Sequence, residues 1–336
     1  MLLLVRDHRV LQRFTYTAML GGLVLLLLPL MPFIGTTING AKIWIRLLGF
    51  SFQPGELAKL VLLVFFAGYL VVKRDVLALA GRRVLGIDLP RARDLGPILL
   101  AWAASLGVLV FERDLGTSLL FFGVFIALLY VATERLSWLL IGIALFLFGS
   151  YIAWLLFGHV QERVDIWLHA FAPRNIGDSS YQLVQGLFGM GTGGVLGKGL
   201  GLGRPDIVPY AQTDFIIPAL GEELGLTGLM AILLLYGIAV QRGLRTALGV
   251  RDSFGKLLAA GLAFSMALQV FVVVGGVTRL IPLTGLTTPF LSYGGSSLVA
   301  NWALVALLLR ISDAARRPAP PPSVSLADAK TQVVRL

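Results

Sequence analysis

The chain has 336 residues, of which 57% are hydrophobic and 14% are charged, whereas roughly 25% are charged in a typical soluble domain. This composition excludes a soluble domain and predicts an all-α, polytopic membrane protein. The sequence contains no cysteine, which excludes disulfides, cysteine-ligated zinc and a catalytic thiol. The three histidines are too scattered to form a metal cage. We attribute the net charge of +10 to cytoplasmic loops and not to nucleic-acid binding.

Eight apolar stretches approach the roughly 20 residues that a helix needs to span a bilayer. In chain order they cover residues 14–33, 57–72, 95–111, 115–132, 136–157, 217–240, 257–277 and 289–309. The second is short and contains Lys59, so it is the weakest by hydropathy alone. Residues 1–311 are expected to form the transmembrane domain, and the proline-rich residues 312–336 a disordered cytoplasmic tail.

The positive charges indicate how the spans are oriented. Most of the 28 Lys and Arg residues fall in the connections on one side of the expected spans, and the positive-inside rule places that side in the cytoplasm. Both chain ends are then cytoplasmic. The one long connection, residues 158–216, is expected outside the cell.

Three carboxylates stand at the head of one apolar run, in "YAQTDFIIPALGEELGLTGLM" at 210–230. Asp214 is expected at the junction of loop and helix, with Glu222 and Glu223 about two turns into the span. A helix through both would put Asp214 and Glu222 roughly 12 Å apart. Asp214 could be a helix cap, but ionisable groups inside a membrane are by default candidates for function.

The long connection contains the glycine-rich stretch "GLFGMGTGGVLGKGLGLGRPD". It matches the dinucleotide pattern G-x-G-x-x-G, but that motif has meaning only between a strand and a helix, so we reject it. Two interpretations stay open. The stretch is either a flexible linker or backbone that approaches a lipid head group, with Lys198 and Arg204 available for phosphate.

Four other charged residues lie near the ends of the expected spans. Glu56 and Lys59 are three residues apart and therefore share a helix face, so they form either an ion pair that holds helices together or a polar cavity wall. Asp114 precedes a span and is expected to cap it with Thr117. Arg279 follows a span, where snorkelling to the interface is sufficient explanation.

Four motifs, in order along nearly the whole chain, resemble the SEDS family of bacterial cell-wall glycosyltransferases, which includes RodA, FtsW and SpoVE. They are "INGAKIWI" with "FSFQPGELAKL", then "RDLGTSLLF", "TDFIIPALGEELGLTG" and "LIPLTGLTTPFLSYGGSSLVANW". The chain is most similar to the elongation-class, RodA-type members. The resemblance implies ten spans with cytoplasmic ends, so the first two are expected to be missing. The chain is then either naturally shortened or begins at an internal methionine, and we favour the interpretation of a misplaced start. Gly55 stands where the family usually has serine.

The resemblance also implies the chemistry and the residues that perform it. The family polymerises lipid II at the outer face of the cytoplasmic membrane, for cell elongation and shape. Asp214 is the family's motif aspartate and the expected general base, with Glu222 and Glu223 shaping the electric field around it. The residues expected to line the substrate cavity are Trp44, Glu56, Lys59, Lys198, Arg204, Glu222, Glu223, Arg279, Ser292, Tyr293, Ser296 and Ser297.

The implied ligands and partners are lipid II, a glycan linked to undecaprenyl pyrophosphate, and a class B penicillin-binding protein that acts as transpeptidase. A divalent cation (Mg or Mn) is compatible with carboxylate and diphosphate oxygens, but no spacing specifies one. Two other functions stay open at this point. A lipid II flippase would need the charged cavity without a base, and a scaffold that recruits the transpeptidase would need neither.

The orientation is testable with reporters that work on one side of a membrane only. A reporter at the C-terminus should be active in the cytoplasm, and one within 158–216 should be active outside, because the positive charges gather on the side of the chain ends. A cytoplasmic signal from the 158–216 reporter would overturn the assignment.

Overall fold

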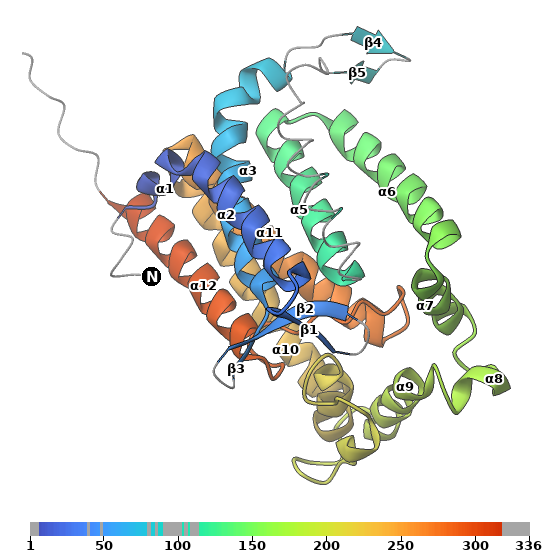
Figure 1. The fold of residues 1–336 in the computed structure, drawn as a ribbon. Helices are drawn as coiled ribbons and strands as arrows, with labels where there is room; N and C mark the ends of the chain where they lie inside the picture. Colours follow the sequence, from blue (N-terminus) through green and yellow to red (C-terminus); the bar gives the residue numbers. More distant parts are fainter. Residues whose placement is uncertain are drawn as a thin grey trace, which may run out of the picture.

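The computed structural model is a bundle of helices (Figure 1). It describes residues 7–38, 41–47, 50–78, 82–84, 87–89, 103, 107 and 114–317. The expected span at 95–111 therefore lies outside the described residues except for 103 and 107, and so does the expected tail beyond Arg317. α12 continues to Arg316, so the start of the tail at 312 was placed too early.

Six helices among the described residues are long and apolar enough to cross a membrane. They are α3 (Pro54–Ala78), α5 (Leu115–Thr133), α6 (Leu136–Leu156), α10 (Ile216–Gly249), α11 (Ser253–Val277) and α12 (Gly295–Arg316). The stretch expected at 14–33 forms a shorter helix, α2 (Thr15–Leu27), followed by the 3-10 turn η1 (Leu28–Leu30). The last span begins at Gly295, since the residues before it form a loop.

α3 and α11 form the centre of the bundle. In each of them 72% of the most apolar window is buried inside the protein, against 6% in α6 and in α10. α3 packs against α2, α5, α11 and α12, and the rings of Phe66 and Phe125 join it to α5 at 5.2 Å. The span that hydropathy supported least is thus a central one, because protein and not lipid surrounds its charged residues.

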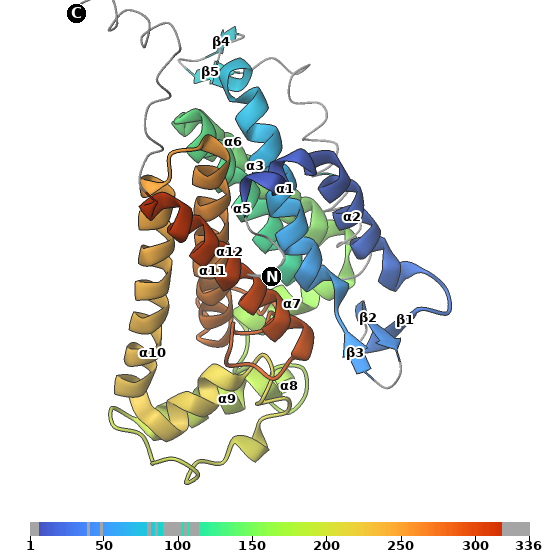
Figure 2. The same ribbon diagram turned by 90° about the vertical axis from the view of Figure 1, so that its left-hand side faces the viewer.

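Smaller elements cover the two ends of the bundle. β1 (Gly35–Ile38), β2 (Ala41–Leu47) and β3 (Phe50–Phe52) make an antiparallel sheet in that order. β4 (Arg82–Val84) and β5 (Ile87–Leu89) pair at the opposite end (Figures 1 and 2). The N-terminal segment contains α1 (Arg9–Arg13), and the long connection contains α7 (Gly158–Leu168), α8 (Pro173–Ile176), α9 (Tyr181–Gly193) and η2 (Pro205–Ile207).

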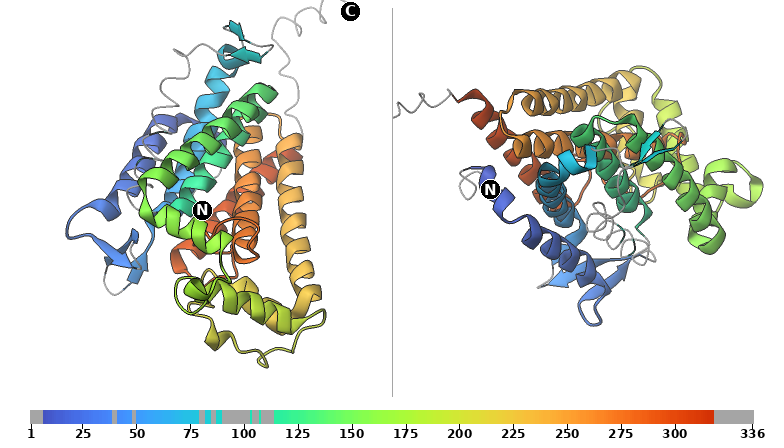
Figure 3. Two further views of the ribbon diagram at one scale, coloured as in Figure 1. Left: turned by 90° about the vertical axis from the view of Figure 1, so that its right-hand side faces the viewer. Right: turned by 90° about the horizontal axis from the view of Figure 1, so that it is seen from above.

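The functional motifs of the sequence gather at one of these ends. The first residues of α3, α5, α10 and α12 lie there, together with the β1–β3 sheet and α7–α9 (Figures 1 and 3). This placement agrees with the alternation of spans expected from the sequence. We call this the motif end of the bundle.

α10 is broken at Gly225. This residue has φ 68° and ψ −172°, a conformation that is essentially restricted to glycine. Residues 216–224 form a separate helical segment across the foot of the bundle, and the helix turns at Gly225 to run along it (Figure 2). Glu222 and Glu223 therefore lie at a corner. The expectation that they sit two turns inside a continuous span is wrong.

The glycine-rich stretch packs backbone to backbone against this corner. Four amide-to-carbonyl hydrogen bonds of 2.9–3.1 Å join the two segments, namely Lys198 to Glu222, Gly199 to Glu223, Leu226 to Gly194 and Thr227 to Val195. A Cβ atom on Gly197 would come within 2.2 Å of the Glu223 carbonyl oxygen. The flexible-linker interpretation is therefore wrong here, because the glycines permit close backbone contact.

Gly225→Ala should lower the free energy of unfolding by about 1–3 kcal/mol, the usual cost of a strained backbone conformation. The added Cβ would also lie 2.3 Å from the Gly197 nitrogen. Gly237→Ala is the matched control, since its Cβ meets nothing within 4 Å and alanine favours a helix by up to ~1 kcal/mol. Thermal unfolding in detergent measures both. Equal melting temperatures for the two variants would contradict the strained corner.

Candidate functional site

A buried ion pair lies near the start of α3. Lys59 Nζ is 3.0 Å from Glu56 Oε2, and the two side chains are 5% and 7% exposed. The predicted pairing on one helix face is confirmed. Lys59 also donates to Gln269 Oε1 on α11 at 2.8 Å, so the pair joins the two central helices.

The polar network continues from α11 to α12 through the loop that precedes α12. Gln269 Nε2 donates to the Thr287 carbonyl at 2.8 Å, and the Thr287 hydroxyl lies 3.3 Å from Glu56 Oε1 and 2.8 Å from Ser297 Oγ. Asn301 Nδ2 donates to the Ser297 carbonyl, and Ser296 is also buried. Sequence reasoning missed Gln269, Thr287 and Asn301. The sequence feature that could have identified them is a polar amide or hydroxyl side chain within or beside an apolar run.

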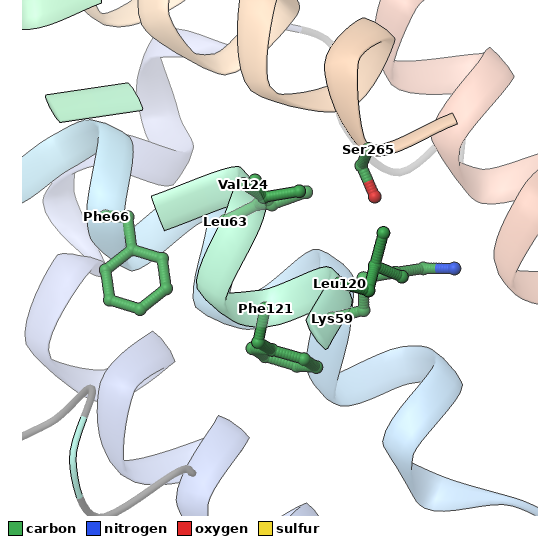
Figure 4. A pocket seen from close by; sticks show the side chains of 7 residues that line it. All are labelled: Lys59, Leu63, Phe66, Leu120, Phe121, Val124 and Ser265. Carbon is green, nitrogen blue, oxygen red and sulfur yellow. The ribbon is translucent and has the colours of Figure 1, made fainter. Parts of the chain in front are cut away.

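A small pocket borders this network between α3, α5 and α11. Its lining residues are Lys59, Leu63, Phe66, Leu120, Phe121, Val124 and Ser265, and Figure 4 shows the Ser265 hydroxyl and the Lys59 side chain among apolar groups. Ser265 Oγ is buried and has no hydrogen-bond partner among the described residues. The Lys59 stem thus runs through an apolar environment, which strengthens its pairing with Glu56.

Asp214 lies in the loop just before α10, and neighbouring segments hold that loop. The Thr213 hydroxyl donates to Asp214 Oδ1 at 2.9 Å. The Ser292 hydroxyl donates to the Thr213 carbonyl at 2.5 Å, and the Tyr293 amide donates to the Gln212 carbonyl at 2.7 Å. Phe215 occupies the N-cap position of α10 without a side-chain cap. Asp214 therefore does not cap the helix, and the Ser292 loop fixes its backbone.

Arg163 on α7 is the charged residue that acts on Asp214. Burial raises the pKa of the Asp214 carboxyl, while Thr213 and the positive charge of Arg163 lower it. Burial lowers the pKa of Arg163, and Asp114 and Asp214 oppose that effect. Arg163 also donates to the Leu283 carbonyl at 2.6 Å. Sequence reasoning missed Arg163 because its partners lie far away in the chain.

Asp114 caps α5 as predicted. Its carboxylate accepts hydrogen bonds from the Thr117 amide at 2.9 Å and from the Thr117 hydroxyl at 2.7 Å. Burial raises the pKa of Asp114, Glu56 raises it further, and Arg163 lowers it. The acids at 56, 114 and 214 and the Arg163 guanidinium therefore form one electrostatic group, which we call the Arg163 group.

Glu222 and Glu223 interact with other residues than those of the Arg163 group. Glu222 is 5% exposed and pairs with Lys198 at 2.5 Å, and the Glu223 side chain lies beside Gly203. The causes of the Asp214 pKa shift are burial, Thr213, the backbone and Arg163. Of the two causes that we expected to raise this pKa, partial burial and the neighbouring acids, burial is the one that acts.

The other expected cations also have protein partners. Arg204 pairs with Asp206 at 3.1 Å on the exposed surface. Arg279 donates to the carbonyls of Trp167 and Leu168 and lies over the Phe171 ring at 5.4 Å. The snorkelling interpretation of Arg279 is therefore wrong. It fastens the loop after α11 to the end of α7, the helix that carries Arg163.

Trp44 lies in β2 at the motif end and is half-buried. Its carbonyl accepts a hydrogen bond from the Thr36 hydroxyl across the sheet. No recorded hydrogen bond or ring contact of the described residues joins Trp44 to the Arg163 group. For a metal, the described part of the chain contains no group of three or more His, Asp or Glu placed to hold one.

Comparison with known proteins identifies the class to which this bundle and site belong. The model of the FtsW/RodA/SpoVE family, described as "Cell cycle protein", matches residues 1–317. The chain belongs to this family, and it is a multi-pass membrane protein.

The similar relatives have specific names. The chain is 58% identical over 315 residues to "Peptidoglycan glycosyltransferase RodA" of Mycobacterium tuberculosis, covering 94% of this chain and 67% of the relative. It is 54% identical to the protein of the same name from Mycobacterium leprae, with 98% and 70% covered. "Probable peptidoglycan glycosyltransferase FtsW" of Geobacter metallireducens is 36% identical, with 91% and 79% covered.

Solved structures have the same fold. One, described as "Structural coordination of polymerization and crosslinking by a peptidoglycan synthase complex", matches with a TM-score of 0.73 and 30% identity over 94% of this chain and 86% of that chain. The Thermus thermophilus rod shape determining protein RodA matches with a TM-score of 0.63 and 27% identity over 94% and 84%.

Glu56→Ala and Lys59→Ala should each destabilise the protein, because each leaves the opposite charge buried without its partner. The expected cost is about 3–5 kcal/mol per single variant, and the double variant should lose less than the sum. Arg317→Ala, which removes an exposed partner of Asp313, is the control and should cost under ~1 kcal/mol. Thermal unfolding in detergent measures all four variants. Additive losses at 56 and 59 would show that the two side chains do not interact.

Proposed function

We propose that this chain polymerises lipid II into glycan strands at the outer face of the cytoplasmic membrane. The observation that carries the proposal is the Asp214 carboxylate, which is half-buried at the motif end. It accepts a hydrogen bond from the Thr213 hydroxyl, the Ser292 loop holds the backbone beside it, and its partial burial raises its pKa. The relatives named peptidoglycan glycosyltransferases support the same reaction class. A buried carboxylate with a raised pKa is a stronger base than an exposed one.

In this reaction a sugar hydroxyl of lipid II attacks the anomeric carbon of a glycan linked to undecaprenyl pyrophosphate. Asp214 accepts the hydroxyl proton as the new carbon–oxygen bond forms. The bond between the anomeric carbon and the diphosphate oxygen breaks, and undecaprenyl diphosphate leaves with the electron pair. The Thr213 hydroxyl orients the carboxylate for this step, because it donates to Asp214 Oδ1.

The Arg163 group supplies the electrostatic setting. Arg163 opposes the effect of burial on the pKa of Asp214, and a positive charge near the reacting groups would stabilise the negative charge that develops on the leaving diphosphate. Lys59 is a weaker candidate for that role, because Glu56 and Gln269 already hold its ammonium group. The Glu56–Lys59 pair instead supports the walls of the site.

We further propose that the chain works with a class B penicillin-binding protein during cell elongation. The solved peptidoglycan synthase complex, described as coordinating polymerization and crosslinking, supports a transpeptidase partner. With the positive-side connections in the cytoplasm, the motif end faces outward, where lipid II head groups and the transpeptidase would lie. Copurification of the tagged chain with such a transpeptidase from detergent extracts of native membranes tests this pairing. Failure of the transpeptidase to copurify would oppose the proposal.

Asp214→Asn should abolish glycan synthesis by the purified protein supplied with lipid II, as measured on a gel that resolves polymer. Asparagine keeps the size of the side chain and one oxygen to accept the Thr213 hydrogen bond, but it cannot accept the proton. Asp206→Asn is the control, since Asp206 is exposed and paired with Arg204, and it should keep normal activity. A folded Asp214→Asn protein that makes normal polymer would refute the base assignment. A wild-type protein that translocates lipid II without polymer would favour a flippase.

Arg163→Gln should move the acidic limb of the pH–activity profile to higher pH. Arg163 lowers the pKa of Asp214, so its removal raises that pKa, and the active deprotonated base then appears only at higher pH. Arg163→Lys, which keeps the charge, should shift the limb less, and Arg204→Gln should leave it in place. An Arg163→Gln profile that is unmoved or moved to lower pH would contradict the coupling.

A further inference from the structure

The glycine-rich stretch exposes a row of large aliphatic side chains. Val195, Leu196, Leu200 and Leu202 are 60%, 82%, 75% and 71% exposed. We call these four residues the aliphatic loop. Soluble surfaces tolerate single exposed leucines, but four large exposed aliphatic side chains within eight positions of one loop indicate an interaction surface.

The exposure of the aliphatic loop is a property of the fold and not of a mobile segment. Its backbone is fixed to the Gly225 corner, since the Thr227 amide donates to the Val195 carbonyl at 3.1 Å and the Lys198 amide to the Glu222 carbonyl at 3.0 Å. The corner is closely packed against the loop, because a Cβ on Gly225 would lie 2.3 Å from the Gly197 nitrogen. The leucines are therefore held outward by the same contacts that turn α10.

The patch continues onto the outer face of α10. Leu226, Met230 and Leu234 are 56%, 57% and 65% exposed on a helix of which only 6% of the apolar window is buried. In a multi-pass membrane protein such a face contacts lipid. Because the Leu226 amide donates to the Gly194 carbonyl at 3.0 Å, the aliphatic loop begins directly beside this lipid-facing surface.

Cations mark the polar border of the patch. Lys198 lies between Leu196 and Leu200 in sequence, with its side chain 36% exposed and its ammonium group on Glu222. Arg204 follows Leu202 and is 67% exposed. Aliphatic side chains next to long cationic ones are typical of segments that lie at the boundary between acyl chains and lipid phosphates.

We propose that the aliphatic loop, together with Leu226, inserts into the lipid leaflet at the motif end and anchors the Gly225 corner at the membrane surface. The anchor fixes the height of residues 216–224, and therefore of Asp214, which lies two residues before that segment. It sets the carboxylate at the level of the lipid head groups. This assignment does not depend on the activity proposed above.

The absence of cysteine from the chain allows a direct measurement of depth. Leu196→Cys and Leu200→Cys are each labelled with a nitroxide, and the proteins are placed in vesicles of phosphatidylethanolamine and phosphatidylglycerol that contain no other protein. Collision with oxygen, which concentrates among acyl chains, is compared with collision with a water-soluble nickel chelate. Leu234→Cys is the lipid-exposed control and Asp206→Cys the loop control, each native side chain being 65% exposed.

The ratio of oxygen to nickel collisions at 196 and 200 should clearly exceed the level at 206 and lie between it and the level at 234, which stands nine residues into the span after Gly225. Ratios at both loop positions equal to that at 206 would overturn the anchor, because the side chains would then lie in water. Since the vesicles contain only this chain, a high ratio cannot come from burial against a different protein. Failure of the proposed glycan synthesis would leave this readout unchanged, so the two proposals are tested separately.

Discussion

The cost of burying charge in an apolar bundle is the constraint on which the site depends. Glu56 and Lys59 form an ion pair within one turn of α3, and Lys59 also donates a hydrogen bond to Gln269 on α11. Removing water from such a pair is favourable only when hydrogen bonds occupy the remaining donors and acceptors. Thr287 supplies one of these bonds, and its loop thereby becomes part of the core.

That same loop connects the buried pair to Asp214. Thr287 contacts Glu56, and five residues later Ser292 holds the carbonyl of Thr213, the residue directly before Asp214. A disturbance of the ion pair would therefore reach Asp214 through a short loop and not through a long helix. The charged residues are linked in a similar way. Arg163 interacts electrostatically with both Asp114 and Asp214. Arg279 joins α7, the helix that carries Arg163, to the loop after α11.

Local patterns in the sequence predicted the parts of the site whose partners are close in the chain. The Glu56–Lys59 pair and the Asp114–Thr117 cap follow from a spacing of three residues on a helix. The interactions of Arg163 and the Lys198–Glu222 pair involve residues that are far apart in the chain and meet only in the fold. No spacing in the sequence predicts them. The hydropathy pattern also predicted one continuous span across Gly225. A hydropathy average over a window of residues does not detect a single residue with a positive φ.

The corner at Gly225 explains why a candidate base can stand at a membrane surface without belonging to a span. Had α10 run straight from Ile216, Glu222 and Glu223 would lie within the span itself, where an unpaired charge is costly. The turn instead brings the corner against the glycine-rich backbone, where Lys198 reaches Glu222. Asp214 is then positioned by the loops at its side. Its pKa can respond to burial and to Arg163 while the charges of the α3–α11 core keep their own partners.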